Sequence, residues 1–447
     1  MDHTNGTKGL ALRAGAASAD LTPQHSVFLF GYPHVPRYST GVHDPLETAA
    51  LYLQGGGGEA LFIANDLIFV GKQLASEVRR RICGETGVPI SAITITATHT
   101  HSGPVIREHP LDNTDPVVPK PDPAYLAFVA DRLTEVGCAA VRSAVPAEAA
   151  LAVARAEGIG TNRHDPAGPA DDEVPVLVVR PVRQQTPLAC MVIYAMHPTV
   201  LHEDSRLISA DFPGFTRRYL RESKWLPPSC PILYHNGASG NQSPRHVAKA
   251  NTFAEAQRLG EKLGECIARV LPGLEFSDRC PVASRSMNVE LQVREIPSVA
   301  AAQVAVDRAA ACLAQLRREQ APRAEVRTAE CACFGAEKSV VLARAVAEGR
   351  LEQAVQGCSP AEVQVIAIGP WKFVTWPGEF FVEYALEVKA RSPQTFVITL
   401  ANGELQGYIV TPAAVAIGSY EAGNALFSPA NGRRVVDATL ALVANVP

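Results

Sequence analysis

Short apolar runs with strand-like composition recur along this chain between longer amphipathic runs, and several of the strand-like runs follow one another directly. Strands are predicted for the runs AITITA, PVLVVRPV, LACMVIYAM, PILYH, VASRSMNVEL, EVQVIAIG, KFVTWP and QTFVITLAN. A strict strand–helix alternation would favour one parallel sheet, whereas strands in direct succession favour antiparallel pairs. We therefore predict an α/β fold with mixed β-sheets flanked by helices.

Capping signals mark where helices begin. Asp122 followed by proline starts one amphipathic run, and Thr252-x-x-Glu255 starts a second as a capping box. A third helix is expected in the Ala-rich run at 298–320. The glycine-rich stretch at 54–60 joins two apolar runs and predicts a hairpin turn. These signals place helices between the strands, as the mixed-sheet prediction requires.

Composition and charge exclude several function classes. The net charge of -4 gives no reason to expect a nucleic-acid partner. The N-terminus lacks a basic segment followed by an apolar one, and no apolar run approaches the roughly 18–20 residues that span a bilayer. The ten cysteines include no C-x-x-C pair and are expected to be reduced. We expect a cytoplasmic protein without stable membrane insertion and, since no linker is evident, one domain over residues 1–447.

Two histidines one residue apart follow a predicted strand, in the stretch THTHSGP. Histidine is the commonest neutral metal ligand and a ready proton carrier. Side chains two apart share a face within a strand, but that rule weakens past its end. His99 and His101 could therefore face a metal and a substrate respectively, or they could be a solvated strand terminus.

His197 also stands at the end of a predicted strand: it follows the apolar run LACMVIYAM and precedes a proline. Ser243 follows another strand in the stretch HNGASGNQSPRH, whose glycines allow tight turns. That serine either holds a hydroxyl near a reacting carbonyl or belongs to an ordinary turn. Glu379, between a strand and an amphipathic helix, suits a metal ligand or a partner of the helix dipole.

Together these stretches resemble the neutral/alkaline, non-lysosomal ceramidase family. The resemblance is carried, in the order that the family shows, by TATHTHSGP, NR, MHPTVL, SAD before FPG, GNQSP, PGEF, GYIVTP and SYEAGNALFSP, over residues 96 to 429. The start of the chain, with ADLTP, FLFGYP and GVHDPLETAALYL, also looks like the start of the family. The resemblance implies a ceramidase-like catalytic domain, and it does not extend to the immunoglobulin-like domain that follows in full-length members.

Members of that family cleave the amide bond of ceramide with one zinc ion, so the resemblance implies Zn²⁺ as the cofactor here. The zinc ligands that it implies are His99, His197, Glu379 and Tyr408. The residues that it implies at the substrate are His101, Ser243, Arg163 and Tyr420. Two imidazoles, a carboxylate and a phenol oxygen suit zinc and leave a position open for water or substrate.

We therefore expect a zinc-dependent amidohydrolase that cleaves the amide of ceramide or of a smaller N-acyl compound. Zinc-activated water is the expected nucleophile, with oxyanion stabilisation by the metal and by His101 and Tyr420. No motif pairs an imidazole with Ser243, which could be a covalent nucleophile or a positioning group. The alternatives are a zinc esterase or lactonase on the same scaffold, and a non-catalytic binding homologue.

The chain departs from the family on the expected walls of the cleft. Val105 and Ile106 follow THTHSGP where the family commonly has glycines, and Arg245 replaces the asparagine after Ser-Pro. The long loop at 105–123 is where we expect substrate choice to be made. Arg245, together with Arg107, His109 and His246, would suit a polar or anionic substrate, unless these are solvated loop residues.

Overall fold

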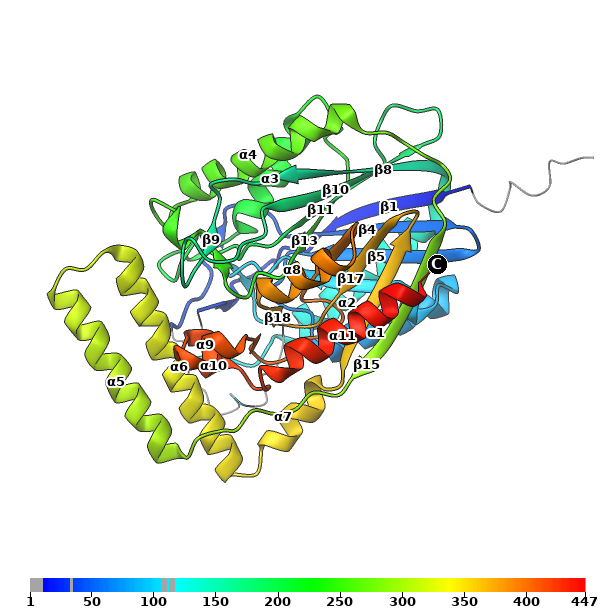
Figure 1. Ribbon diagram of the computed structural model, residues 1–447. Helices are drawn as coiled ribbons and strands as arrows, with labels where there is room; N and C mark the ends of the chain where they lie inside the picture. Colours follow the sequence, from blue (N-terminus) through cyan, green and yellow to red (C-terminus); the bar gives the residue numbers. More distant parts are fainter. Residues whose placement is uncertain (1–10, 33–34, 107–110, 112–116, 447) are drawn as a thin grey trace, which may run out of the picture.

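Two β-sheets packed face to face form the centre of the protein, seen here in a computed structural model that describes residues 11–32, 35–106, 111 and 117–446 (Figure 1). The larger sheet has eight strands in the order β13-β11-β10-β8-β1-β4-β5-β6. In chain order its strands are β1 (Arg13–Asp20), β4 (Glu47–Gly55), β5 (Gly58–Asn65), β6 (Ile93–Ala97), β8 (Val145–Arg155), β10 (Glu173–Pro181), β11 (Ala189–Tyr194) and β13 (Ile232–Asn236). The smaller sheet has four strands, β15 (Val282–Val289), β16 (Ala361–Ile368), β17 (Trp371–Thr375) and β19 (Thr395–Ile398).

Both sheets are mixed, which confirms the predicted fold class. β6 runs parallel to β5, and β13 runs parallel to β11, while the other neighbours in the larger sheet are antiparallel. In the smaller sheet only β17 and β19 are parallel. The eight predicted runs all contain strands. The predicted hairpin is also present: β4 and β5 are joined through Gly56 and Gly57, whose φ angles of 63° and 88° suit glycine.

The two sheets bury a common apolar core between them. Phe62 of the larger sheet and Phe373 of the smaller sheet meet edge to face, with ring centroids 5.8 Å apart. Around them, Ile366 and Ile398 of the smaller sheet join Leu177 of the larger sheet in the same buried cluster. Both faces of these strands are therefore covered, which explains why their sequences read as nearly continuous apolar runs.

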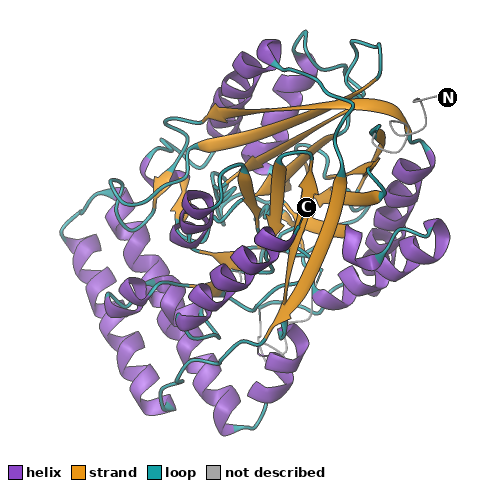
Figure 2. Cartoon of the chain, turned by 45° about the vertical axis from the view of Figure 1, so that its right-hand side comes forward, coloured by secondary structure: helices purple, strands orange, loops and turns teal. Residues whose placement is uncertain are grey.

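Helices cover the outer faces of both sheets, so the strands lie inside the molecule (Figure 2). One half of the larger sheet packs on α1 and α2, and its other half packs on α3 and α4. The smaller sheet is covered by α8 and α11. These helices are α1 (Lys72–Thr86), α2 (Pro123–Arg142), α3 (Asp211–Glu222), α4 (Phe253–Val270), α8 (Val382–Arg391) and α11 (Ala430–Asn445).

The predicted helix starts are confirmed, one of them only in part. The Asp122 side chain accepts a hydrogen bond from the Ala124 backbone N–H, as an N-cap does. The Thr252 hydroxyl likewise accepts from the N–H of Glu255. The carboxylate of Glu255, however, bonds to the backbone N–H of Lys249 and to Arg258. It therefore supports the loop before α4 as well as the helix itself.

A helical hairpin projects from one end of the molecule, made of α5 (Val299–Arg318) and α6 (Arg323–Ala347) and followed by α7 (Leu351–Cys358) (Figure 1). The expected helix at 298–320 is α5, which packs along α6. Among the described helices, α5 is long and apolar enough to cross a membrane by length and composition alone, a candidate that was not predicted from the sequence, and only 6% of it is buried. No separate sequence signal predicted α6, which forms a wall of the candidate site.

The two edge strands of the larger sheet approach each other, although six strands separate them in the sheet order. The Thr96 hydroxyl on β6 lies 2.8 Å from Nδ1 of His235 on β13. Both groups are fully buried. Because β6 and β11 both end near this closure, the segments that follow them, with His99 and His197, reach the same region.

Candidate active site

His99 lies just past β6 in a turn that aims its imidazole inward. Its φ angle is 72°, a left-handed conformation that is uncommon outside glycine. Its backbone N–H donates to the Leu67 carbonyl at 2.9 Å, and its Nδ1 lies 2.8 Å from the Ile68 carbonyl oxygen. A carbonyl can only accept, so Nδ1 carries the proton and Nε2 keeps its lone pair.

His197 is held in the same way on the segment after β11. Its Nδ1 donates to the Ser239 carbonyl at 2.6 Å, and its backbone N–H donates to the Gln242 carbonyl at 3.2 Å. Its Nε2 is therefore also a free lone pair. Burial, with a contribution from the Arg163 guanidinium, lowers the pKa of His197 to about 4, so the ring is neutral at pH 7.

Glu379 reaches both imidazoles from a short parallel strand pair. The pair is β18 (Glu379–Phe380) and β20 (Tyr408–Ile409), in which Glu379 lies directly beside Tyr408. The Oε2 of Glu379 lies 3.1 Å from Nε2 of His197 and 3.3 Å from Nε2 of His99.

His101 completes a cluster of three histidines, with its Nε2 3.4 Å from Nε2 of His99. Its ring packs on Gly31, where an added Cβ would come within 2.6 Å of it, and its carbonyl accepts a hydrogen bond from Arg37. Its Nδ1 is buried without a hydrogen-bond partner in the described structure. Burial holds its pKa well below the usual range.

The donor set fits a metal ion. The ligand atoms of the three histidines all lie within 4.8 Å of one another, and the contacts with Glu379 are 3.1 and 3.3 Å. A tetrahedral ion with ligands at 2.0–2.1 Å would hold its donors about 3.3 Å apart. Neutral imidazoles with their second nitrogens bonded to carbonyl oxygens are the form in which histidine binds metals. His99, His101 and His197 could therefore hold a metal ion, with Glu379 beside them.

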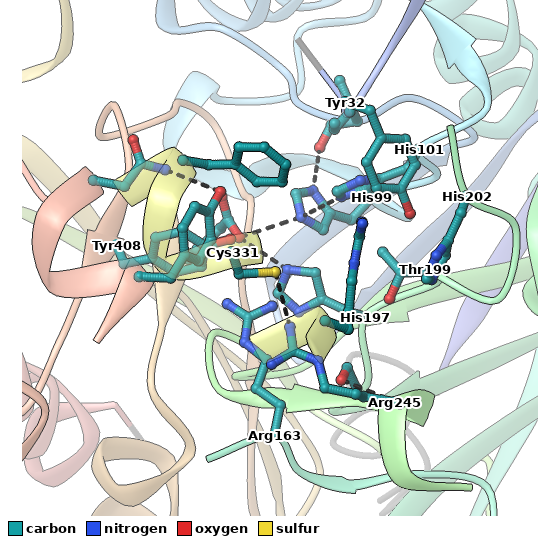
Figure 3. A pocket seen from close by; sticks show the side chains of 18 of the residues that line it. Tyr32, His99, His101, Arg163, His197, Thr199, His202, Arg245, Cys331 and Tyr408 are labelled. Atoms are coloured by element: carbon teal, nitrogen blue, oxygen red, sulfur yellow. Dashed lines mark hydrogen bonds and ion pairs between the residues drawn. The ribbon is translucent and has the colours of Figure 1, made fainter. Parts of the chain in front are cut away.

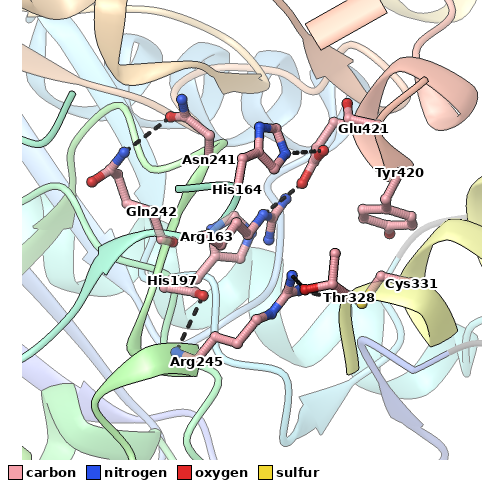
Figure 4. A network of polar contacts seen from close by, with 12 residues as sticks. Arg163, His164, His197, Asn241, Gln242, Arg245, Thr328, Cys331, Tyr420 and Glu421 are labelled. Carbon is pink, nitrogen blue, oxygen red and sulfur yellow. Dashed lines mark hydrogen bonds and ion pairs between the residues drawn. The ribbon is translucent and has the colours of Figure 1, made fainter. Parts of the chain in front are cut away.

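Tyr408, Tyr420 and Arg163 lie together on one side of this cluster. The Arg163 guanidinium carbon is 5.3 Å from the Tyr408 ring centroid and 5.8 Å from that of Tyr420. Its Nε donates to Glu421 Oε1 at 2.5 Å, and His164 Nε2 lies 2.7 Å from the other oxygen of Glu421 (Figure 4). Burial raises the pKa of both tyrosines, so their phenols are neutral O–H donors at pH 7.

Ser243 lies in β14 (Gln242–Ser243), which pairs with β9 (Thr161–Asn162) and so brings Arg163 close. The Ser243 Oγ accepts from the Arg245 backbone N–H at 3.3 Å. Among the described residues, no imidazole lies within hydrogen-bonding distance of that oxygen.

The eight residues predicted from the sequence as metal ligands or substrate contacts line one cavity of about 340 Å³ (Figure 3). The cavity brings together the four predicted metal ligands and the four residues predicted at the substrate. Their individual roles stay predictions. Apolar side chains also line the cavity. Those from the N-terminal part of the chain are Phe30, Ile68 and Phe69, and those from α6 are Phe334 and Val341. Such a pocket suits a ligand with an apolar part and a polar reacting group.

Several residues that shape the site were not singled out from the sequence. Glu421 carries no sequence signal beyond its place next to Tyr420, and Arg37 lies in a loop 64 residues from its partner His101. Gly31 has a φ angle of 123°, a conformation that favours glycine, so the glycine itself is the sequence signal for this turn. His202, left out of the sequence prediction, also lines the cavity.

Of the four residues expected to suit an anionic substrate, the structure describes two. Arg245 lines the cavity, whereas His246 bonds through Nε2 to the Arg163 carbonyl, at 3.2 Å. Arg107 and His109 lie outside the described residues, as does most of the loop in which substrate choice was expected.

Comparison with solved structures identifies the fold. A crystal structure of neutral ceramidase from Pseudomonas aeruginosa matches with a TM-score of 0.74 and 17% identity, over 98% of this chain and 75% of that one. A ceramidase complexed with C2 matches with a TM-score of 0.72 and 16% identity, over 98% and 76%. No protein-family model and no curated sequence matches. The chain therefore has a neutral ceramidase-like fold.

Proposed function

We propose that the protein is a zinc-dependent hydrolase that cleaves the C–N amide bond of an N-acylated compound. The observation that carries the proposal is the convergence of imidazole and carboxylate donors at metal-like separations, in a pocket with apolar walls. The similarity in fold to ceramidase structures supports an amide as the bond that is cleaved.

The zinc would be held by His99, His197, Glu379 and Tyr408. When bound, zinc supplies Lewis-acid chemistry, which polarises a carbonyl oxygen and makes water more acidic. Hydrogen bonds from Nδ1 of His99 and His197 to carbonyl oxygens orient these ligands before any ion arrives. His101 also belongs to the three-histidine cluster, and its assignment to the substrate rather than the metal is part of the proposal.

The other polar side chains of the pocket would act on the substrate. His101, neutral in the folded protein, would take the proton that water loses on adding to the carbonyl carbon and would then give it to the amine nitrogen as the C–N bond breaks. Tyr420 and Arg163 can donate hydrogen bonds to the oxygen that becomes negative in the tetrahedral intermediate. Ser243 would position the substrate, because the described structure shows no histidine beside its hydroxyl.

Two alternatives use the same pocket. The same donors would stabilise the oxyanion of an ester or a lactone, so an esterase or lactonase is the second candidate. A binding protein that kept the fold is the third. A carboxylate and two imidazoles with oriented nitrogens are a costly arrangement to keep buried without a ligand, which favours an enzyme.

The test combines metal analysis with a substrate panel. Purified protein should contain about one equivalent of zinc and should release fatty acid and amine from an N-acyl amide. Chelation should remove the activity and added zinc should restore it. Active protein without metal would overturn the zinc assignment. Turnover of esters alone would favour the esterase or lactonase. Binding of these compounds without turnover of any of them would favour the binding protein.

A further inference from the structure

The Arg245 side chain lies in the candidate pocket without an ion-pair partner among the residues that the structure describes. It starts two residues after Ser243 and extends across the pocket wall toward α6 (Figures 3 and 4). There its Nη1 donates to the Thr328 hydroxyl at 3.2 Å and its Nη2 donates to the Cys331 sulfur at 3.3 Å. Within the described structure no carboxylate oxygen lies within ion-pair distance of this guanidinium.

The neighbouring arginines of the pocket are neutralised. Arg163 is paired with Glu421 at 2.5 Å. Arg327 is paired with Glu203 at 2.8 Å and with Glu330 at 3.1 Å. Burial lowers the pKa of Arg245, and the charges of Arg163 and Arg327 lower it further, although Cys331 and Glu421 act in the opposite direction.

A second arginine extends the positive charge to the rim of the pocket. Arg323, at the start of α6, bonds to the side-chain oxygen of Asn251 and has no carboxylate partner among the described residues. Asn251 lines the pocket as well. The wall between Ser243 and α6 therefore carries two guanidinium groups that form no ion pair with a carboxylate among the described residues.

We propose that Arg245 binds a carboxylate of the substrate, so that the preferred substrates are N-acyl amino acids rather than neutral N-acyl amides. This inference rests on the proposed amide hydrolysis. A guanidinium recognises a carboxylate through two parallel hydrogen bonds, and a charge-assisted pair of this kind is strong where water is scarce. The acyl group would lie against the apolar residues, among them Phe69 and Phe334.

The experiment compares two amides that differ only in the group that Arg245 would bind. N-Lauroyl-glycine carries a carboxylate where N-lauroyl-ethanolamine carries a hydroxymethyl group. The kcat/KM ratio of the acid to the alcohol should exceed ten for the unmodified holoenzyme. In Arg245→Gln the ratio should fall at least tenfold, mainly through KM for the acid. Arg245→Lys keeps the positive charge but cannot form the two parallel hydrogen bonds of a guanidinium, so it should give an intermediate ratio.

The control is Arg80→Gln, since Arg80 is exposed on α1 and bonds only to the Ser76 carbonyl in the described structure. Its ratio should equal that of the unmodified protein. A ratio near one in the unmodified protein, or an equal loss for both amides in a folded Arg245→Gln, would overturn the inference and leave amide hydrolysis standing.

Binding measurements separate this inference from the proposed function. If neither amide is hydrolysed, the proposed function fails, and calorimetric titration with the same two compounds then decides on Arg245. Tighter binding of N-lauroyl-glycine that is lost in Arg245→Gln would support the carboxylate site. Equal affinities for the two compounds would contradict it.

Discussion

Thr96 and His235, on strands at opposite edges of the larger sheet, are joined by a buried contact of 2.8 Å between Oγ1 and Nδ1. The Thr96 hydroxyl therefore links the strand that precedes His99 to the strand that precedes Ser243. Because the candidate ligands come from segments after different strands, their separation depends on how tightly this closure holds.

Replacing Thr96 by valine should loosen the closure. The substitution keeps the shape but leaves Nδ1 of buried His235 without its partner, which costs roughly 1–3 kcal/mol of unfolding free energy. Chemical denaturation measures the loss. Thr186→Val, at an exposed loop position, is the matched control and should change stability little. Equal stability of Thr96→Val and the unmodified protein would show that the contact contributes nothing.

His235 should make the protein less stable in mild acid. Burial lowers its pKa to about 3, below the ~6.5 of an unfolded chain. Between these values the unfolded chain binds a proton that the folded protein does not, so this residue's contribution to stability falls as pH drops below ~6.5. The loss from pH 7 to pH 5 is roughly 2 kcal/mol. In His235→Gln the free energy of unfolding should therefore fall by roughly 2 kcal/mol less between pH 7 and pH 5 than in the unmodified protein.

The two histidines of THTHSGP should behave differently when each is replaced by alanine. His99→Ala should lose both metal and activity, because His99 is a predicted ligand. His101→Ala should keep the metal and lose roughly 10²–10⁴-fold in kcat, the usual effect of removing a general acid. Zinc content and kcat are measured on the same preparations. Metal loss in His101→Ala would instead make the three-histidine cluster the ligand set.

Removing the partner of Arg163 should be costly. In Glu421→Gln the buried guanidinium keeps its charge without a carboxylate, which destabilises a protein by roughly 3–5 kcal/mol. We also expect a lower kcat, because Arg163 would no longer be held against Tyr408 and Tyr420. Glu135→Gln breaks an exposed ion pair with Arg132 and should cost under ~1 kcal/mol. Similar melting temperatures for the two variants would contradict the structural role of Glu421.

A methyl group at position 31 should disturb His101 alone among the histidines. The φ angle of 123° suits glycine, and an added Cβ would lie 2.6 Å from the His101 side chain. Gly31→Ala should therefore reduce kcat while zinc content stays near one equivalent. Gly57→Ala also has a positive φ but open space around it, so it controls for backbone strain. A normal kcat in Gly31→Ala would argue against a role for His101 in turnover.

Local sequence was sufficient for much of the secondary structure. The eight predicted strands, the hairpin at 54–60 and the capped helices were all read from apolar runs, glycines and capping residues. β1 and β8 were missed because they are rich in alanine, which is not typical of strands. They form strands since their neighbours in the sheet supply the hydrogen bonds and the packing.

The sequence by itself also determined which chemistry the site can offer, through histidines after strands and through PGEF and the two tyrosines. It did not determine the separation of those groups, because no local pattern encodes the contact between Thr96 and His235. The same holds for Glu421, 258 residues from Arg163, and for the wall that α6 adds beside Arg245. Only the tertiary structure decides such contacts, because each depends on packing between segments that are distant in the chain.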